Sequence, residues 1–170
     1  MLKHTTGDLL VLAESGEFDV ILHGCNCFNT MGGGIARQIR EQYPVAARVD
    51  AETRRGDYNK LGNWTESQAG DYFDNMTFGV SNKRPLEKRF TILNCYTQYN
   101  MSTGQDVFEY TAFQLILEKL LHVYGDKRIG MPYIGMGLAG GDAARIMPMI
   151  ENFAIKVTER GGSVTLVRWV

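Results

Sequence analysis

Runs of apolar residues divide the chain into segments and predict where its strands lie. Residues 20–25, 90–96 and 127–131 are mainly apolar and contain β-branched or aromatic side chains. Such runs are typical of strands that are covered on both faces, as in a parallel sheet. Shorter segments predict an opening strand over 2–4, a further strand over 63–68 and a closing strand over 163–169.

Between the strands, apolar residues recur every three or four positions, as in helices with one buried face. The clearest example is 106–124, where Leu117 and Leu121 lie on one face. Asp106 and Glu109 have the spacing of a capping box, which predicts that this helix begins at Asp106. Helices are also expected over 33–43, from Pro44 to residue 53 or 54, and over 145–160 with Pro148 in the first turn.

Segment 71–86 is less regular, because its aromatic residues alternate with turn formers, and it predicts a hairpin. Elsewhere strands and helices alternate, and no linker or repeat interrupts them. This order predicts one α/β domain over 1–170 with a largely parallel sheet.

The composition is that of an ordinary soluble domain. The chain has 170 residues, of which 44% are hydrophobic and 22% charged, and its formal net charge is −1. This balance disfavours electrostatic binding to nucleic acid polymers, which generally requires a basic face. The basic cluster of Lys83, Arg84, Lys88 and Arg89 is either a local binding patch or, more simply, a solvated loop.

The three cysteines, Cys25, Cys27 and Cys95, fit a reducing compartment. An odd number without a signal peptide is typical of a cytoplasmic protein. No metal site is expected, because Cys25 and Cys27 have no second pair and the three histidines are scattered. No apolar run approaches the roughly 20 residues of a membrane span, so no membrane partner is expected.

Two glycine-rich loops, within 21–36 and 129–141, each lie between an expected strand and an expected helix. Glycine permits a positive φ and lets a ligand approach the main chain closely. In a strand–loop–helix unit, backbone N–H groups and a helix N-terminus converge on one position, which favours phosphate. The two loops together therefore predict a phosphate-rich ligand held between them.

The second loop also matches the dinucleotide fingerprint, as Gly135-x-Gly137-x-x-Gly140. Two features argue against a nicotinamide-dependent dehydrogenase. Pro132 breaks the strand before the glycines, and the next strand finishes the chain without an acidic residue at its end. A P-loop NTPase is also disfavoured, because the chain lacks the required lysine-serine or lysine-threonine pair after a glycine.

Three motifs in a fixed order resemble those of the macrodomain family. They are Thr6-Gly7-Asp8-Leu9, then Asn26 ahead of Gly32-Gly33-Gly34-Ile35-Ala36, then Pro132-x-Ile134-Gly135-x-Gly137-Leu138-x-Gly140-Gly141. The string His23-x-Cys25-Asn26-Cys27 is most similar to the branch that contains the yeast-type ADP-ribose-1″-phosphate phosphatase. The resemblance runs nearly from end to end. It implies a three-layer α/β/α fold, with a mixed, largely parallel central sheet and an ADP-ribose cleft at the carboxyl ends of the strands.

The resemblance also assigns ligand contacts. Asp8 would accept a hydrogen bond from the adenine amino group beside Leu9, and Asn26 would bind the distal ribose. The remaining contacts would come from Gly32, Gly33, Gly34 and Ile35 around the distal ribose and its phosphate, and from Ile134, Gly135, Met136, Gly137 and Leu138 along the diphosphate. Structural alternatives stay open: Asp8 can cap a turn, Asn26 can be a turn residue, and Met136 and Leu138 can wall the cleft.

The implied activity is hydrolysis of ADP-ribose 1″-phosphate to ADP-ribose and phosphate, without a metal or cofactor. His23 is the best candidate for proton transfer, because an ordinary histidine pKa of about 6.5 suits neutral pH. Alternatively, His23 has only a structural role. Asp142 is a weaker acid/base candidate, which can instead cap the last helix.

Two other functions stay open. One is a reader that binds ADP-ribose or ADP-ribosylated macromolecules without catalysis, and the other is a hydrolase that removes ADP-ribose from them. A related hydrolase uses a lysine and an aspartate, whose positions resemble those of Gln98 or Thr97 and of Ala139 here. Because these residues lack the necessary groups, that route is disfavoured.

Overall fold

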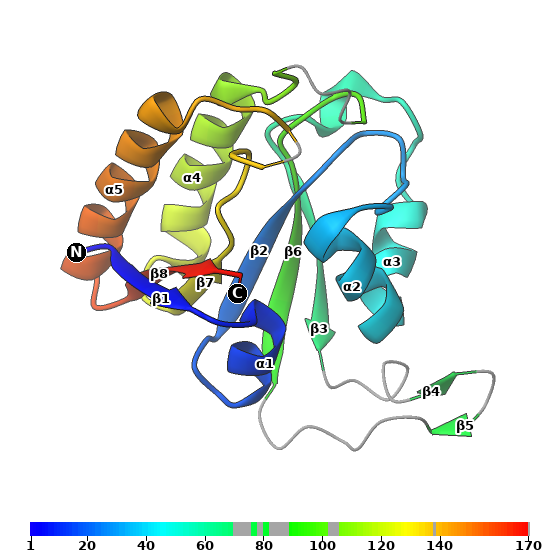
Figure 1. Ribbon diagram of the computed structural model, residues 1–170, viewed down its shortest axis with the longest axis horizontal. Helices are drawn as coiled ribbons and strands as arrows, with labels where there is room; N and C mark the ends of the chain where they lie inside the picture. The colour runs from blue at the N-terminus through cyan, green and yellow to red at the C-terminus, as the bar shows by residue number, and fades with distance from the viewer. Residues whose placement is uncertain (70–75, 78–79, 82–88, 102–105, 138, 170) are drawn as a thin grey trace.

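A mixed six-stranded sheet organises the chain (Figure 1). Its strands are β1 (Lys3–Thr6), β2 (Val20–Cys25), β3 (Trp64–Ala69), β6 (Phe90–Tyr96), β7 (Arg128–Met131) and β8 (Ser163–Arg168). They lie in the order β1-β8-β7-β2-β6-β3, and only β3, paired with β6, runs antiparallel to its neighbour. The structure is a computed structural model that describes residues 1–170 except 70–75, 78–79, 82–88, 102–105, 138 and 170.

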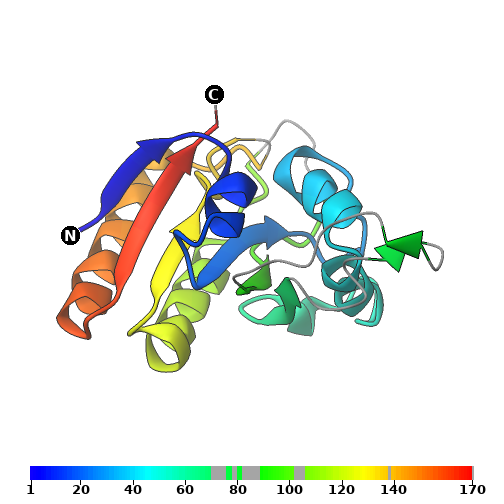
Figure 2. The ribbon, with the colours of Figure 1, turned by 90° about the horizontal axis from the view of Figure 1, so that it is seen from below.

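Helices cover both faces of this sheet. The helices on one face are α1 (Leu9–Glu14), α2 (Gly34–Gln42) and α3 (Pro44–Ala51), and those on the other are α4 (Tyr110–Tyr124) and α5 (Ala143–Glu159) (Figures 1 and 2). A short 3-10 helix, η1 (Tyr58–Lys60), follows α3. The expected three-layer α/β/α class is therefore confirmed.

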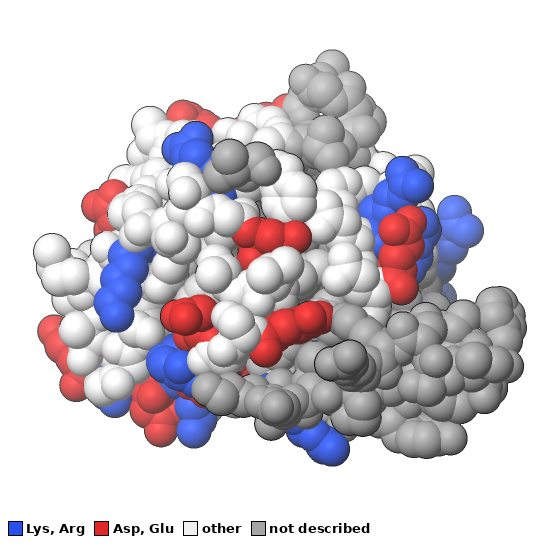
Figure 3. Space-filling view, turned by 60° about the horizontal axis from the view of Figure 1, so that its bottom comes forward, with Lys and Arg blue, Asp and Glu red and all other residues white. Residues whose placement is uncertain are grey.

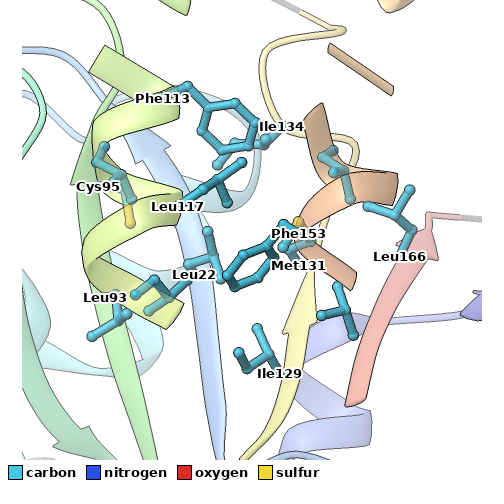
Figure 4. Packing of buried hydrophobic residues seen from close by; sticks show 14 of the residues in the cluster. Leu22, Leu93, Cys95, Phe113, Leu117, Ile129, Met131, Ile134, Phe153 and Leu166 are labelled. Atoms are coloured by element: carbon cyan, nitrogen blue, oxygen red, sulfur yellow. The ribbon is translucent and has the colours of Figure 1, made fainter. Parts of the chain in front are cut away.

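The core explains the apolar runs in the sequence. Along β2, Leu22 faces α4 and α5, whereas the neighbouring Ile21 packs with the cluster beneath α1, α2 and α3. Leu93 and Ile92 of β6 divide in the same way, because successive side chains of a strand point to opposite faces. Figure 4 shows Leu22 and Leu93 packed with Phe113 and other apolar side chains between the sheet and the two long helices. Both faces of the central strands are thus buried, which requires apolar residues at nearly every position.

The strands β2 and β6 have the predicted bounds, and β1, β3, β7 and β8 lie within two residues of theirs. Within the expected hairpin, β4 (Met76–Thr77) pairs antiparallel with β5 (Val80–Ser81). The remainder of that segment lies outside the described residues, as do three of the four basic residues noted above, Lys83, Arg84 and Lys88.

The predicted capping box at the start of α4 is wrong. Asp106 accepts hydrogen bonds from Phe108 N at 3.1 Å and from the Tyr110 hydroxyl at 2.6 Å. Phe108 instead forms an isolated bridge with Gln98, which keeps the chain extended until Glu109. A tertiary contact therefore delays the helix by four residues.

Two more helices begin where the sequence did not predict a helix start. Asp8, for which a turn was one alternative, caps the first turn of α1. At the other end of the chain, Asp142 caps α5, which begins at Ala143. Pro148 therefore lies inside α5 rather than in its first turn.

Acidic and basic side chains are interspersed on the face that Figure 3 shows, in agreement with the small net charge. Among the described helices, none combines the length and apolar character of a membrane span.

Candidate functional site

A cavity of about 570 Å³ opens where three parallel strands end. Its wall includes Cys25 at the end of β2, Thr97 just after β6 and Pro132 just after β7. The carboxyl ends of parallel strands are the usual place for ligands in open α/β sheets. Both predicted glycine loops contribute to the wall. The predicted site residues on it are Asn26, Gly32, Gly33, Gly34, Ile35, Ile134, Gly135 and Gly137.

The first loop is held in a strained conformation. Asn29 and Met31 have φ values of 58° and 42°, which residues other than glycine rarely adopt. The Asn29 amide donates to Thr53 O at 2.9 Å, and Asn29 Oδ1 accepts from Lys60 Nζ at 2.5 Å. Lys60 Nζ also donates to Cys27 O at 3.0 Å. A buried lysine thus fixes a loop that lines the cavity.

Asn26 has the internal bonds of a turn residue. Its Oδ1 accepts from Phe28 N at 2.8 Å, and its Nδ2 donates to Thr30 Oγ1 at 2.7 Å. The residue nevertheless lies on the cavity wall, so a ribose contact through the remaining amide capacity stays a prediction.

The N-terminus of α2 gives the cavity an anion-attracting end. Gly33 is the N-cap and makes no side-chain capping bond, so the first N–H groups of α2 are not covered by a capping side chain. Gly33, Gly34, Ile35 and Ala36 all line the cavity. Such N–H groups and the helix dipole favour a bound phosphate.

The second loop needs glycine at its centre. Gly135 has a φ of 76°, and its carbonyl oxygen accepts from Gly141 N at 2.7 Å. Gly137 also lines the cavity. Met136 packs against the large core cluster and does not belong to the wall, so it has an apolar packing role but not the expected place in the cleft wall. Leu138 lies outside the described residues.

Asp8 and Leu9 lie outside the cavity wall. Asp8 Oδ1 accepts from Leu10 N at 2.9 Å and from Val11 N at 3.3 Å. Its Oδ2 has no partner among the described residues, so the carboxylate can cap α1 and still accept one more hydrogen bond. Leu9 is buried in the core.

His23 is fully buried and does not line the cavity. Its Nε2 lies 2.7 Å from Asn94 Oδ1. Burial lowers the pKa of His23 to about 4, and the bond to Asn94 opposes this shift. The neutral, enclosed ring favours the structural alternative over direct proton transfer to a ligand.

Asp142 is also outside the cavity wall. Its Oδ1 accepts from Ala144 N at 2.9 Å, and its own N–H donates to the Tyr110 hydroxyl at 2.9 Å. The guanidinium of Arg145 lies 3.6 Å from the centre of the Tyr110 ring. These contacts favour the helix-capping alternative for Asp142.

Sequence reasoning missed Asp50, which lines the cavity from α3. Burial raises its pKa, while a hydrogen bond from Tyr96 and the charge of Lys60 oppose that shift. A signal was available, because Ala46 and Asp50 are four residues apart and share the buried face of one helix.

The thiols offer no activated nucleophile. Burial raises the pKa of Cys27 to about 11 and that of Cys25 well above its ordinary value. The described residues contain no group of three His, Cys, Asp or Glu side chains placed to hold a metal ion. Among the described wall residues there is no lysine or arginine, so the anion-attracting groups are backbone N–H groups.

Two proteins are similar to this chain over most of its length. It is 28% identical over 175 residues to the uncharacterized 17.5 kDa protein in the tk-vs intergenic region of Enterobacteria phage T4, covering 99% of this chain and 97% of that protein. It is 27% identical over 147 residues to ADP-ribose 1″-phosphate phosphatase of Lodderomyces elongisporus, covering 82% and 84%. No protein-family model matches the chain.

Solved structures share its fold at low sequence identity. The macrodomain of Mycobacterium tuberculosis DarG superposes with a TM-score of 0.66 at 16% identity, covering 97% of both chains. A Trypanosoma brucei macrodomain in complex with ADP-ribose superposes with a TM-score of 0.63 at 14% identity, covering 99% of this chain and 63% of that one. These similarities confirm the resemblance that the motifs indicated: the chain has the macrodomain fold.

Proposed function

We propose that this protein binds ADP-ribose in the cavity and hydrolyses ADP-ribose 1″-phosphate to ADP-ribose and phosphate. The observation that carries the proposal is a cavity of about 570 Å³ enclosed by two glycine loops, with the N-terminus of α2 in its wall. Its size is in the range of small-molecule sites, and its exposed backbone suits a diphosphate and a terminal phosphate.

The similar proteins support this choice of ligand and substrate. One of them is an ADP-ribose 1″-phosphate phosphatase, and one structural neighbour contains ADP-ribose. In the proposed orientation, the diphosphate lies along Gly135 and Gly137, and the distal ribose with its phosphate lies at Asn26 and the Gly32–Gly34 loop. Asp8 accepts from the adenine amino group through its unpartnered Oδ2.

The proposed reaction needs positioning and charge stabilisation more than a strong base. The oxygen of a water molecule attacks the phosphorus, the bond from phosphorus to the ribose 1″-oxygen breaks, and a proton from water is left on that oxygen. Negative charge in such transition states is spread over the phosphoryl oxygens. Backbone N–H groups at the start of α2 are the donors that we propose for this charge. His23 acts only indirectly in this proposal.

A non-catalytic ADP-ribose reader is the second candidate. It is favoured by the positions of His23 and Asp142, which are both outside the cavity wall. A reader needs the loops and the adenine contact, but no group that transfers a proton. A hydrolase acting on ADP-ribosylated macromolecules is a less supported form of the proposal, because no lysine lies among the described wall residues.

A phosphorus NMR time course with ADP-ribose 1″-phosphate in excess distinguishes these functions. The phosphatase converts the monoester signal to inorganic phosphate over many turnovers. A reader shifts or broadens the diphosphate signals and leaves the monoester intact. A second spectrum is recorded with the protein in excess over the ligand. If the ligand signals are unchanged there too, both the phosphatase and the reader are contradicted.

A further inference from the structure

Asp50 brings a carboxylate to a cavity whose backbone N–H groups favour anions. It is the penultimate residue of α3, it is 2% exposed, and it is the one acidic residue among the described residues of the wall. Its Oδ1 accepts a hydrogen bond from the Tyr96 hydroxyl at 2.7 Å. Its Oδ2 has no partner among the described residues, and the residue lines the cavity.

A continuous series of hydrogen bonds, buried at its two ends and part-buried at Thr65, connects Asp50 with His23. His23 Nε2 lies 2.7 Å from Asn94 Oδ1, and Asn94 Nδ2 lies 3.1 Å from Thr65 Oγ1. Thr65 Oγ1 lies 3.1 Å from the Tyr96 hydroxyl, which bonds Asp50. The four side chains before Asp50 project from β2, β6 and β3 on the face of the sheet that α3 covers.

The donors and acceptors of this series have one consistent direction. Asn94 Nδ2 also donates to Ala46 O at 3.0 Å, which fixes the orientation of the amide, so Asn94 Oδ1 accepts from His23. The single proton of the Tyr96 hydroxyl is donated to Asp50, so Thr65 must donate to Tyr96. Every bond is thus donated toward Asp50, which orients its carboxylate through Oδ1 and leaves Oδ2 free to accept a hydrogen bond.

The position of Asp50 defines the part of the ligand that it meets. Thr53 Oγ1 donates to Asp50 O at 2.6 Å and lies 3.2 Å from Asn29 Oδ1, so Asp50 lies beside the first loop. This is the end of the cavity to which the proposed function assigns the distal ribose. A carboxylate oxygen repels phosphate and accepts strongly from hydroxyl groups.

We propose that Asp50 Oδ2 accepts a hydrogen bond from a hydroxyl group of the distal ribose, so that the cavity selects ADP-ribose over ADP. This inference rests on the proposed function. Asp50 is a specificity-determining residue in this account, whereas Tyr96 and His23 are positioning residues that orient its carboxylate. It explains why a buried histidine without access to the ligand stands directly before the first glycine loop.

Calorimetric titration of ADP-ribose and ADP into the wild type, Asp50→Asn and Glu52→Gln tests the inference. The asparagine keeps an acceptor for Tyr96 and removes the acceptor that faces the cavity. We expect Asp50→Asn to weaken ADP-ribose binding about tenfold, in the range of a lost charge-assisted bond, and to leave ADP binding unchanged or slightly stronger. Glu52→Gln removes a neighbouring exposed charge outside the wall, and both affinities should stay at the wild-type values.

The outcomes separate the two proposals. If the wild type binds neither ligand, the proposed function fails, and this inference fails with it. If the wild type binds ADP-ribose and Asp50→Asn weakens both ligands equally, or neither, only the inference is overturned.

A second measurement does not depend on the folding of a variant. The wild type is titrated with ADP-ribose analogues that each lack one hydroxyl of the distal ribose. We expect the analogue that lacks the hydroxyl group bonded to Asp50 to bind about tenfold more weakly than ADP-ribose, because it loses the same charge-assisted bond. If all of them bind as tightly as ADP-ribose, the inference is overturned.

Discussion

Gly135 lies directly against the ring of Phe108: a Cβ built at this position would be 2.5 Å from two ring carbons. Phe108 belongs to the core cluster on the α4 and α5 side, so the second loop is packed onto the core through a glycine. The positive φ of Gly135 adds a second requirement for this residue.

Replacement of Gly135 by Ala should therefore disrupt both the fold and the second loop. We expect a loss of about 2 kcal/mol or more in the free energy of unfolding, from backbone strain and overpacking together. Urea unfolding measures this change in the free energy of unfolding. Gly137→Ala is the matched control, since its Cβ would meet nothing within 4 Å, and the free energy of unfolding should change little. Equal losses for the two variants would contradict this description of the loop.

Lys60 should be needed for the shape of the first loop. Lys60→Met removes donors to Cys27 O and Asn29 Oδ1 and leaves both acceptors without their buried partner. We expect a loss of about 2 kcal/mol in stability and weaker ADP-ribose binding, because Asn29 no longer holds its left-handed conformation. Thermal unfolding and calorimetric titration measure the two effects.

Lys119 offers the control, because its Nζ also donates to a backbone carbonyl and an asparagine oxygen, those of Gly62 and Asn63. These bonds lie away from the cavity wall. Lys119→Met should leave ADP-ribose affinity at the wild-type value. If Lys60→Met also binds normally, the loop does not depend on this lysine.

His23 should make stability depend on pH in a specific window. Its pKa is lowered to about 4 in the folded protein, from an ordinary value of 6.5, so between these values the unfolded chain binds the proton and the folded chain does not. The stability from this residue is complete above about pH 6.5 and decreases by about 3 kcal/mol as the pH falls to 4. His23→Gln keeps a donor for Asn94 but does not titrate.

Urea unfolding of the wild type and His23→Gln at pH 7 and pH 4.5 tests this. The carboxylates titrate in both proteins, so the comparison isolates the histidine. We expect the wild type to lose more stability than the variant on acidification. Parallel losses in the two proteins would mean that His23 is not held neutral by burial.

Asp142 should act as a helix cap rather than as a catalytic acid or base. Asp142→Ala should cost about 1 kcal/mol of stability, because Ala144 N loses its partner. Asp142→Ser should restore most of it, since serine also caps helices. Turnover of ADP-ribose 1″-phosphate should be similar in both variants and the wild type. A hundredfold decrease in turnover without a change in stability would instead assign Asp142 to catalysis.

The sequence predicted the central strands well because their pattern has a single cause. Ile21, Leu22, Ile92 and Leu93 are buried on opposite faces of one sheet, so the apolar runs alone locate β2 and β6. The glycine loops were found for a similar reason, since close backbone approach and positive φ restrict the residue type directly, as at Gly135.

Features that depend on contacts between distant segments could not be predicted. The start of α4 is set by the bridge between Phe108 and Gln98, and no local pattern contains that pairing. The spacing of Asp50 from Ala46 indicates a shared helix face, but only the packing of α3 over Tyr96 brings Asp50 to the cavity. The structural role of His23 could not be predicted for the same reason, because its ring is buried and bonded to Asn94 of β6, 71 residues away in the sequence.

ADP-ribose is proposed to bind between the two glycine loops. Titration of ADP-ribose into the 15N-labelled protein, followed by backbone amide shifts, tests both the binding and its location. We expect saturable shifts at Gly32–Ile35 and at Ile134–Gly137, with little change at residues on the outer face of α5 such as Lys156. Saturating ADP-ribose that leaves the amides of both loops unshifted would contradict the account.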